Sequence, residues 1–267
     1  MNVCKKLAQN LVLVLLVLFS ASCAFDGRIH RSEAEADPFE SINRPIFEFN
    51  YQFDKYILKP LAKGYRAITN QFIRERIHGI ITNIKEPISM VNHLLQADPK
   101  ATVVSLNRFV INSTLGLAGM FDVADGWGLK KEETGFNATL AHWCIKDGPY
   151  IVLPFWGPST PRATVGLIAD GFANPVYWAT LNDANVRDKI IYSYVAVSSV
   201  SMREAALDIG DDLERNSVDF YATMRSAYLQ NQSKLRCFND DGSAGQTYDF
   251  DFGIEEEDAA FDEMEEE

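Results

Sequence analysis

The sequence predicts one mainly helical domain over residues 37–237, and three observations lead to that prediction. Large apolar residues recur at alternating spacings of three and four, which is the period of an amphipathic helix. The one long apolar stretch without this period, residues 149–162, carries four prolines, which exclude a regular helix or a central strand and predict an extended segment. No internal repeat is visible, and no second apolar cluster follows Cys237.

The opening stretch, residues 37–65, is the strongest helical signal. Asp37 is placed to cap the first turn, and Pro38 suits the first helical position. Pro45 predicts a kink, or a restart of the helix with Asn43 as its cap, because proline lacks the donor that a continuing helix needs. The apolar stripe is rich in aromatic rings and consists of Phe39, Ile42, Ile46, Phe49, Phe53, Tyr56 and Leu61.

Polar side chains accompany this stripe at Asn43, Asn50 and Asp54. A helix with rings on one side and amides on the other suits a boundary between lipid and water. The alternative is a core helix with a solvated back, and the pattern alone favours this second reading. The remaining helices are expected at residues 74–84, 88–95 (separated from the previous one at Pro87), from Pro99 onward, 136–143, 163–171, 174–181, 185–209 and 211–230.

The N-terminal residues have the pattern of a secretory signal, predicted to cover residues 1–22. Lys5 and Lys6 precede an apolar run over residues 11–19, which is too short to span a membrane. Cys23 follows small residues, so we expect it to carry the lipid of a lipoprotein; an ordinary secretory signal cleaved nearby is the alternative. Residues 23–36 are polar and are expected to form a tether.

The charge of the chain is concentrated at its C-terminus. The formal net charge is −12, and residues 239–267 hold thirteen Asp and Glu with no Lys or Arg. We therefore expect residues 238–267 to form a disordered acidic tail. The rest of the chain is close to neutral and has no evident basic face, which argues against a nucleic-acid partner.

Catalytic chemistry has no positive support in the sequence. The four histidines are scattered without metal-ligand spacing, and no nucleophile motif or phosphate-binding glycine loop is present. His142 and Cys144 lie two residues apart, but no third group is evident to orient a base, so two half-buried side chains are the favoured reading. Cys144 and Cys237 could form one disulfide or stay as two separate buried thiols, and the sequence does not choose between these.

Tryptophans gather in the irregular middle of the chain, at Trp127, Trp143, Trp156 and Trp178. Amphipathic aromatic side chains of this kind are typical of membrane interfaces, although they also fill ordinary cores. Together with a lipid anchor and an apolar extended segment, they favour a body that lies in one membrane leaflet.

Several motifs in order give the chain a family resemblance. They are Asp37-Pro-Phe-Glu with Asn43-Arg44 and Phe49-Asn50, Lys59-Pro60 to Gly64-Tyr65, Asn83 with Glu86-Pro87, Asn92 to Gln96, Arg108-Phe109 with Asn112, Leu115-Gly116 to Ala124, Gly148-Pro149-Tyr150 to Arg162, and Asp170. Over residues 37–230 the chain resembles the MlaA (VacJ) lipoproteins of the Gram-negative outer membrane. It departs from their pattern at Asn137, Ala141 and Cys144, where glycine is usual, and at Ala163, where aspartate is usual.

The resemblance implies a ring-like domain of short amphipathic helices in the inner leaflet of the outer membrane, beside a trimeric porin. It implies a channel that takes mislocalised phospholipid from the outer leaflet to a periplasmic carrier and so maintains lipid asymmetry, without an enzymatic step or a cofactor. As candidate channel and gate residues we take Ile42, Asn43, Asn50, Asp54 and Arg162. The competing hypotheses are a periplasmic ligand-binding or structural lipoprotein without channel activity, and a lipid hydrolase, which would need a nucleophile and a base.

Overall fold

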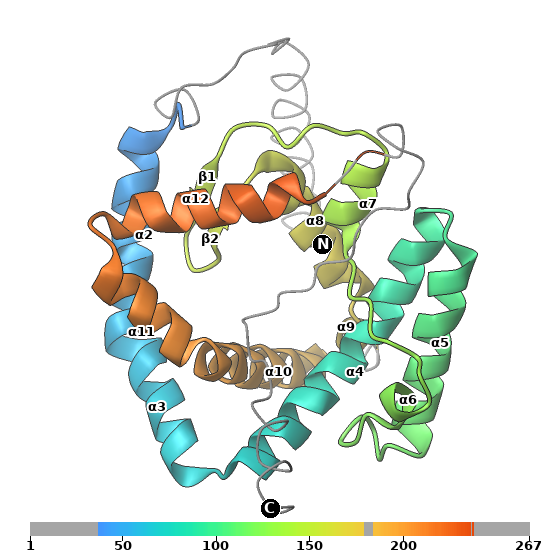
Figure 1. Ribbon diagram of the computed structural model, residues 1–267. Helices are drawn as coiled ribbons and strands as arrows, with labels where there is room; N and C mark the ends of the chain where they lie inside the picture. The colour runs from blue at the N-terminus through green and yellow to red at the C-terminus, as the bar shows by residue number, and fades with distance from the viewer. Residues whose placement is uncertain (1–36, 179–183, 236, 238–267) are drawn as a thin grey trace, which may run out of the picture.

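The computed structural model describes residues 37–178, 184–235 and 237 (Figure 1). The predicted signal peptide, the lipid anchor at Cys23, the tether and the acidic tail lie outside the described residues. The described chain forms helices and one small hairpin: α2 (Glu40–Phe53), η2 (Asp54–Leu58), α3 (Lys59–Ile68), α4 (Gln71–Leu95), α5 (Pro99–Thr114), α6 (Val123–Gly126), α7 (Phe136–His142), β1 (Ile151–Leu153), β2 (Gly157–Ser159), α8 (Pro161–Ala173), α9 (Pro175–Trp178), α10 (Ala184–Ala205), α11 (Leu207–Asn216) and α12 (Phe220–Ser233).

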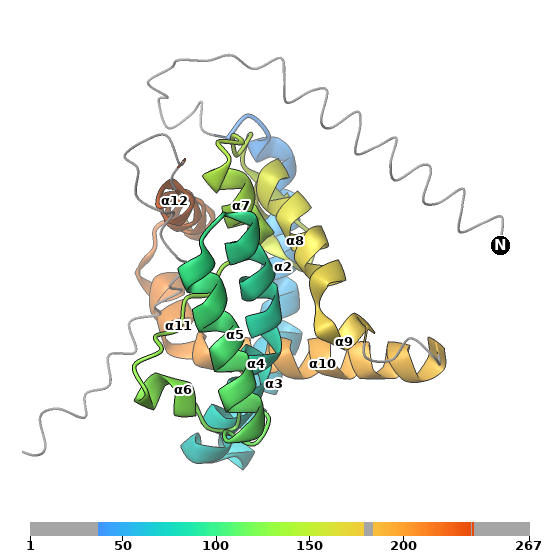
Figure 2. The same cartoon turned by 90° about the vertical axis from the view of Figure 1, so that its right-hand side faces the viewer.

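The helices follow the outline of the molecule in Figure 1. α2, η2 and α3 run down one side, and α4 returns along the other with α5 packed against it. α10 packs against α3 and α4, while α7 packs against α8. Figure 2 shows α12 on one side of this body and the end of α10 next to α9 projecting on the other. The mainly helical class is confirmed. The arrangement supports a ring, and its closure into a ring remains our prediction.

The proline-rich segment is extended, as expected, and folds back on itself. β1 pairs antiparallel with β2, with Val152 opposite Pro158 and Leu153 opposite Gly157. Proline is acceptable in a two-stranded hairpin because both strands are edges, where a missing donor breaks no ladder. Phe155 and Gly157 take positive φ values of 67° and 79°, which turns the chain between the strands. The hairpin packs against α2 and α12.

The restart considered for the helix at Pro45 and the separation of two helices predicted at Pro87 are wrong. α2 runs through Pro45, and α4 runs as one helix through Pro87. Each proline removes one backbone donor, and packing of the helix against its neighbours outweighs that local cost. The irregularity appears instead at η2, a turn of wider π-helix just before Pro60, where the missing N–H relaxes the ordinary helical pairing.

The capping predictions had mixed outcomes. The helix expected from Pro99 onward is α5, and Asp98 caps it, because its side chain accepts from the Ala101 N–H at 2.9 Å. Asn43 is not a cap: it lies inside α2 and is buried. Asp37 accepts from the Phe39 N–H at 3.2 Å, but the helix begins only at Glu40. The last predicted helix is divided, because the chain leaves the helical conformation at Ser217, between α11 and α12.

Candidate functional site: a polar interior between α2, the hairpin and α12

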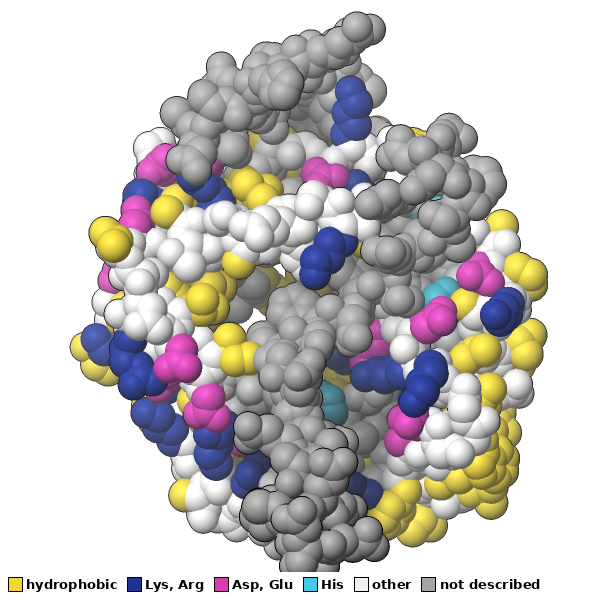
Figure 3. Space-filling model, viewed as in Figure 1, with side chains coloured by type: hydrophobic (Ala, Val, Ile, Leu, Met, Phe, Trp, Pro, Cys, Tyr) yellow, Lys and Arg dark blue, Asp and Glu magenta, His cyan; other side chains and the backbone are white. Residues whose placement is uncertain are grey.

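Burial in the described part of the chain is inverted relative to an ordinary globular domain. Polar and charged side chains outnumber hydrophobic ones among the fully buried residues. Large hydrophobic side chains lie on the surface instead, as the edge near α5 and α6 shows in Figure 3. In the opening helices Ile42, Phe49 and Tyr56 are 58%, 50% and 71% exposed. The core-helix reading of the aromatic stripe is therefore wrong for these residues, because the side of α2 that packs inward is the polar one.

Asn43 is the best-connected side chain of that inward face. Its Nδ2 donates to Asp37 Oδ1 at 2.8 Å and to the Tyr150 carbonyl at 3.1 Å. Its Oδ1 accepts from the Val152 N–H at 2.9 Å. One buried amide thus joins the start of α2 to strand β1.

Asn50 repeats this arrangement two turns later. Its Nδ2 donates to the Leu153 carbonyl at 2.9 Å, and its Oδ1 accepts from the Phe155 N–H at 2.7 Å. The Phe155 ring contacts those of Phe49 and Phe53 edge-on at 5.3 and 5.1 Å between centroids. The tip of the hairpin is therefore held on α2 by one amide and a small aromatic cluster.

Asp54 lies one turn further and binds a different element. It accepts from Nε and Nη2 of Arg203 in α10, at 2.6 and 2.9 Å. These hydrogen bonds raise the pKa of the Arg203 guanidinium above its ordinary value. Asn43, Asn50 and Asp54 thus share one face of the helical run, and each attaches a segment far away in the sequence.

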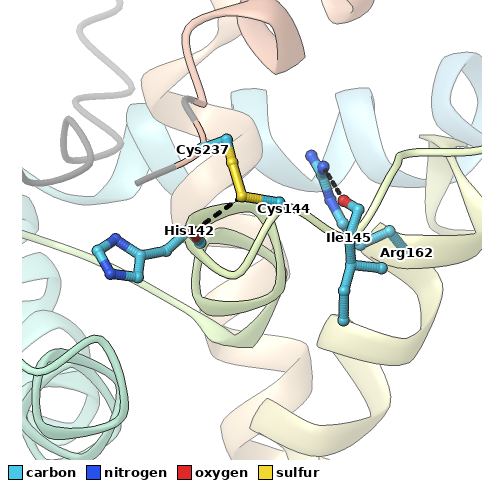
Figure 4. The surroundings of a disulfide bond; sticks show 5 residues. All are labelled: His142, Cys144, Ile145, Arg162 and Cys237. Carbon is cyan, nitrogen blue, oxygen red and sulfur yellow. Dashed lines mark hydrogen bonds between the residues drawn. A yellow bond between two sulfur atoms is a disulfide. The ribbon is translucent and has the colours of Figure 1, made fainter. Parts of the chain in front are cut away.

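Arg162 lies in the first turn of α8 and is buried, with each nitrogen of its guanidinium partnered. It donates to Asn137 Oδ1 at 2.8 Å and to the Ile145 carbonyl at 2.8 Å, as Figure 4 shows for the second bond. It forms an ion pair with Asp147 and reaches Gln232 Oε1 in α12 at 3.4 Å. Burial raises the pKa of the Asp147 carboxyl, although Arg162 acts in the opposite direction.

The structure therefore brings three of the predicted residues together around the hairpin and α10, and places the other two elsewhere. Arg162 lies at the junction of α7, α8 and α12. Ile42 is next to Asn43 in the chain but points outward, consistent with its 58% exposure. Cys23 lies outside the described residues.

Two further polar networks are buried beside α4. Arg108 binds Glu86 at 2.8 Å and Asp122 at 2.6 Å, and burial raises the pKa of the Glu86 carboxyl. Asp170 accepts from the Phe136 N–H at the start of α7 and from Asn92 Nδ2. Burial also raises the pKa of Asp170 above its ordinary value. These groups satisfy one another and hold α4, α5, α7 and α8 in place.

Cys144 and Cys237 form a disulfide, which settles the choice that the sequence left open (Figure 4). Their Cα atoms are 4.7 Å apart. Since Cys144 is bonded to Cys237, a catalytic thiol paired with His142 is excluded in this state. In the part of the chain that the structure describes, no group of His, Cys, Asp and Glu is placed to hold a metal ion.

Sequence reasoning missed the partners of the predicted residues. Arg162 is held by Gln232, 70 positions away in the sequence, and by Asn137, 25 positions away. Asp54 is held by Arg203, 149 positions away. No local spacing carries such a signal. Tyr150 was noticed only as part of a motif, yet its carbonyl receives Asn43 and its ring is buried against those of Tyr221 and Tyr228.

Comparison with known families and proteins gives a consistent result. A family model described as MlaA lipoprotein matches residues 35–235. The intermembrane phospholipid transport system lipoprotein MlaA of Haemophilus influenzae is 33% identical over 228 residues, which is 82% of this chain and 88% of that protein. The protein of the same name from Escherichia coli is 34% identical over 212 residues, or 78% and 80% of the two chains.

A protein of Rickettsia typhi is 38% identical over 192 residues, covering 72% of this chain and 74% of that one. A solved structure from work described as "Structural basis for maintenance of bacterial outer membrane lipid asymmetry" matches with a TM-score of 0.64 and 35% identity. The match covers 76% of this chain and 98% of that chain. Across the helices that the structure describes, none combines the length and apolar character needed to cross a bilayer.

Proposed function

Because the chain belongs to the MlaA lipoprotein family, we propose that it is an outer-membrane lipoprotein that removes mislocalised phospholipid from the outer leaflet. It offers the lipid a channel and passes it to a periplasmic carrier, which maintains the lipid asymmetry of the outer membrane. The named relatives are lipoproteins of a phospholipid transport system and not members of a known enzyme family, so no covalent chemistry is required of this chain.

The inverted burial is the observation that carries this proposal. A phospholipid headgroup cannot cross hydrocarbon unaided, because burying unpaired charge is costly. A body with polar side chains inside and exposed rings outside lowers that cost while its own surface contacts acyl chains. The exposed rings and the family resemblance support placing such a body in one leaflet.

The anchor and the partners complete the proposal. Cys23 carries the lipid on the periplasmic side of the outer membrane, a porin lies beside the domain, and a soluble periplasmic carrier receives the phospholipid. The family resemblance supports these three assignments. The acidic tail beyond Phe238 is proposed to steer a carrier with a basic surface, because exposed charge accelerates association in a salt-dependent way.

The candidate gate lies where α2 meets the hairpin. Asn43 and Asn50 hold the hairpin on α2, Asp54 holds α10, and Arg162 holds the end of α12. Movement of the hairpin away from α2 requires the bonds of Asn43 and Asn50 to break together. We therefore propose the joint at Ile42 and Asn43 as the control point of the passage.

The test is the phospholipid content of the outer leaflet in cells that lack the protein. We expect this content to rise in such cells and to return to normal when the full chain is restored. A variant with Cys23→Ser, expressed at the same level, should restore it poorly because the body, although it still binds lipid surfaces, is no longer held specifically at the outer membrane. Unchanged outer-leaflet phospholipid in the deletion strain would instead support a periplasmic ligand-binding or structural lipoprotein.

A further inference from the structure

Helix α12 is attached to the rest of the molecule at two separate ends. At its N-terminal end, Asp219 accepts from Nη2 of Arg44 at 2.6 Å, and Tyr221 donates its hydroxyl to the buried Asp37. The rings of Phe220 and Tyr221 lie edge-on to Phe47 at 5.5 and 5.4 Å. This end is held by charge, hydrogen bonds and aromatic packing at once.

The C-terminal half packs through Tyr228, whose ring lies 5.9 Å from that of Tyr150, and through Leu229, which contacts the same buried cluster. Gln232 Oε1 accepts from Asn137 Nδ2 at 3.1 Å and from Arg162 at 3.4 Å. The disulfide between Cys237, four residues beyond the end of α12, and Cys144, just after α7, is the covalent part of this attachment. Figure 1 shows what the attachment holds: α12 crosses in front of the hairpin, from α11 and α2 to α7 and α8.

The disulfide joins an exposed residue, Cys144, to a half-buried one, Cys237. Cys144 is exposed and has a φ of 62°, in the left-handed region that favours glycine. Asn137 and Cys144 stand where the resemblance leads us to expect glycine, and each contributes a side chain to holding the C-terminal end of α12. Both substitutions therefore act on the same attachment.

We propose that the Cys144–Cys237 disulfide fastens α12 across the molecule and is a site of reversible thiol–disulfide exchange. Its partner is a dithiol reductant in the compartment to which the protein is exported. Reduction releases the C-terminal half of α12, while the contacts of Asp219 and Tyr221 retain the N-terminal half. The consequence for lipid passage rests on the proposed function: freeing α12 widens the side of the passage that it crosses.

The exchange is chemically balanced by the dithiol. One thiolate of the reductant attacks the sulfur of Cys144, the bond between the two cysteines breaks, and Cys237 leaves as a thiolate that takes up a proton. The second thiolate of the reductant then attacks the mixed disulfide and releases Cys144 as a thiol. Two electrons pass to the protein, and the dithiol becomes a disulfide.

Amide hydrogen exchange on the full chain in detergent tests the first half of the proposal. Protein reduced with dithiothreitol and alkylated with iodoacetamide is compared with oxidised protein. We expect exchange in residues 226–233 to accelerate about tenfold or more, with residues 220–224 and α5 changing little. Equal exchange in both states would overturn the proposal, and so would equal acceleration throughout α5 and α12.

Two variants distinguish the effect of the disulfide from that of the hydrogen bonds of Gln232. C144S/C237S should show fast exchange in residues 226–233 without reductant, and no further change when reductant is added. Gln232→Ala, which keeps the disulfide, should change exchange there by less than about threefold. If the double variant does not fold, reduction of the folded wild-type protein remains the test. A larger change of amide exchange in residues 226–233 from Q232A than from reduction would contradict the proposal.

The phospholipid content of the outer leaflet tests the second half of the proposal, the effect of α12 on lipid passage. Cells with C144S/C237S should hold more of it than cells with the wild-type chain at equal abundance. If exchange responds to reduction but the lipid does not, α12 is fastened by the disulfide without controlling passage, and the second half fails. If wild-type chain itself has no effect on the lipid, the proposed function fails while the exchange result stands.

Discussion

At the scale of single residues, buried amides do the work that hydrophobic contacts do in ordinary cores. Asn43 uses both ends of its amide, so the hairpin is bonded to α2 through a side chain and not through a backbone ladder. A side chain that satisfies several buried groups costs much to remove, because each group left behind loses its partner in a place where water does not replace it. Asn50 makes a similar pair of bonds at a less buried position.

Asn43→Ala should therefore destabilise the protein more than Asn50→Ala. We expect the first change to lower the free energy of unfolding by about 3 kcal/mol and the second by about 1 kcal/mol. Urea unfolding in one fixed detergent, followed by circular dichroism, measures both. Equal effects, or an effect of Asn43→Ala below about 0.5 kcal/mol, would show that the amide is not what holds the hairpin.

At the scale of elements, the sequence predicted most helices and misplaced their interruptions. The Asp98 cap and the apolar period fix α5, and the short α7 is where it was expected, because these signals are local. Pro45 and Pro87 looked like breaks, yet α2 and α4 continue through them, since packing against distant segments outweighs one lost bond. Asn43, Asn50 and Asp54 share one face of the helical run, whereas Ile42 points outward and Arg162 lies in α8. The partners Arg203 and Gln232 could not be found from spacing.

The joint at Ile42 and Asn43 gives a prediction about register. Deleting both residues turns the start of α2 by about 200° relative to the rest, at 3.6 residues per turn. Asp37 then no longer faces Tyr221, the bonds of Asn43 to the hairpin are lost, and Asn50 alone still joins α2 to the hairpin. We expect a folded but leaky protein that raises outer-leaflet phospholipid even beside the wild-type chain. Asn43→Ala, which keeps the register, is the control; a deletion that behaves like absence of the protein would contradict a gate at this joint.

At the scale of the whole molecule, the distribution of side chains sets the solvent that the protein needs. Hydrophobic side chains are exposed on most helices, while the face seen in Figure 3 carries charged groups of both signs near α3 and α11. Lys59 of α3 lies between Asp211 and Glu214 of α11, at 2.8 and 3.2 Å. The aromatic residues of the sequence indicated a surface with both hydrophobic and polar parts. Only the fold decides which of these residues face outward.

A chain without its acyl groups should therefore still need a lipid-like environment. We expect Cys23→Ser to remain bound to phospholipid vesicles in a flotation assay and to aggregate when detergent is removed. Truncation after Phe238, which removes the acidic tail, should leave this behaviour and the thermal stability unchanged. A monodisperse Cys23→Ser protein in plain buffer would argue for a water-soluble binding lipoprotein.

The disulfide also gives the chain a covalently closed loop. It closes a loop between residues 144 and 237 that includes α8, α10, α11 and α12. A loop of this length restricts the unfolded chain enough to favour the folded state by about 4–5 kcal/mol in the chain-entropy account. A cut of the backbone anywhere inside the loop leaves the two fragments joined, so a nicked molecule keeps α12 tied to α2, α4 and α7.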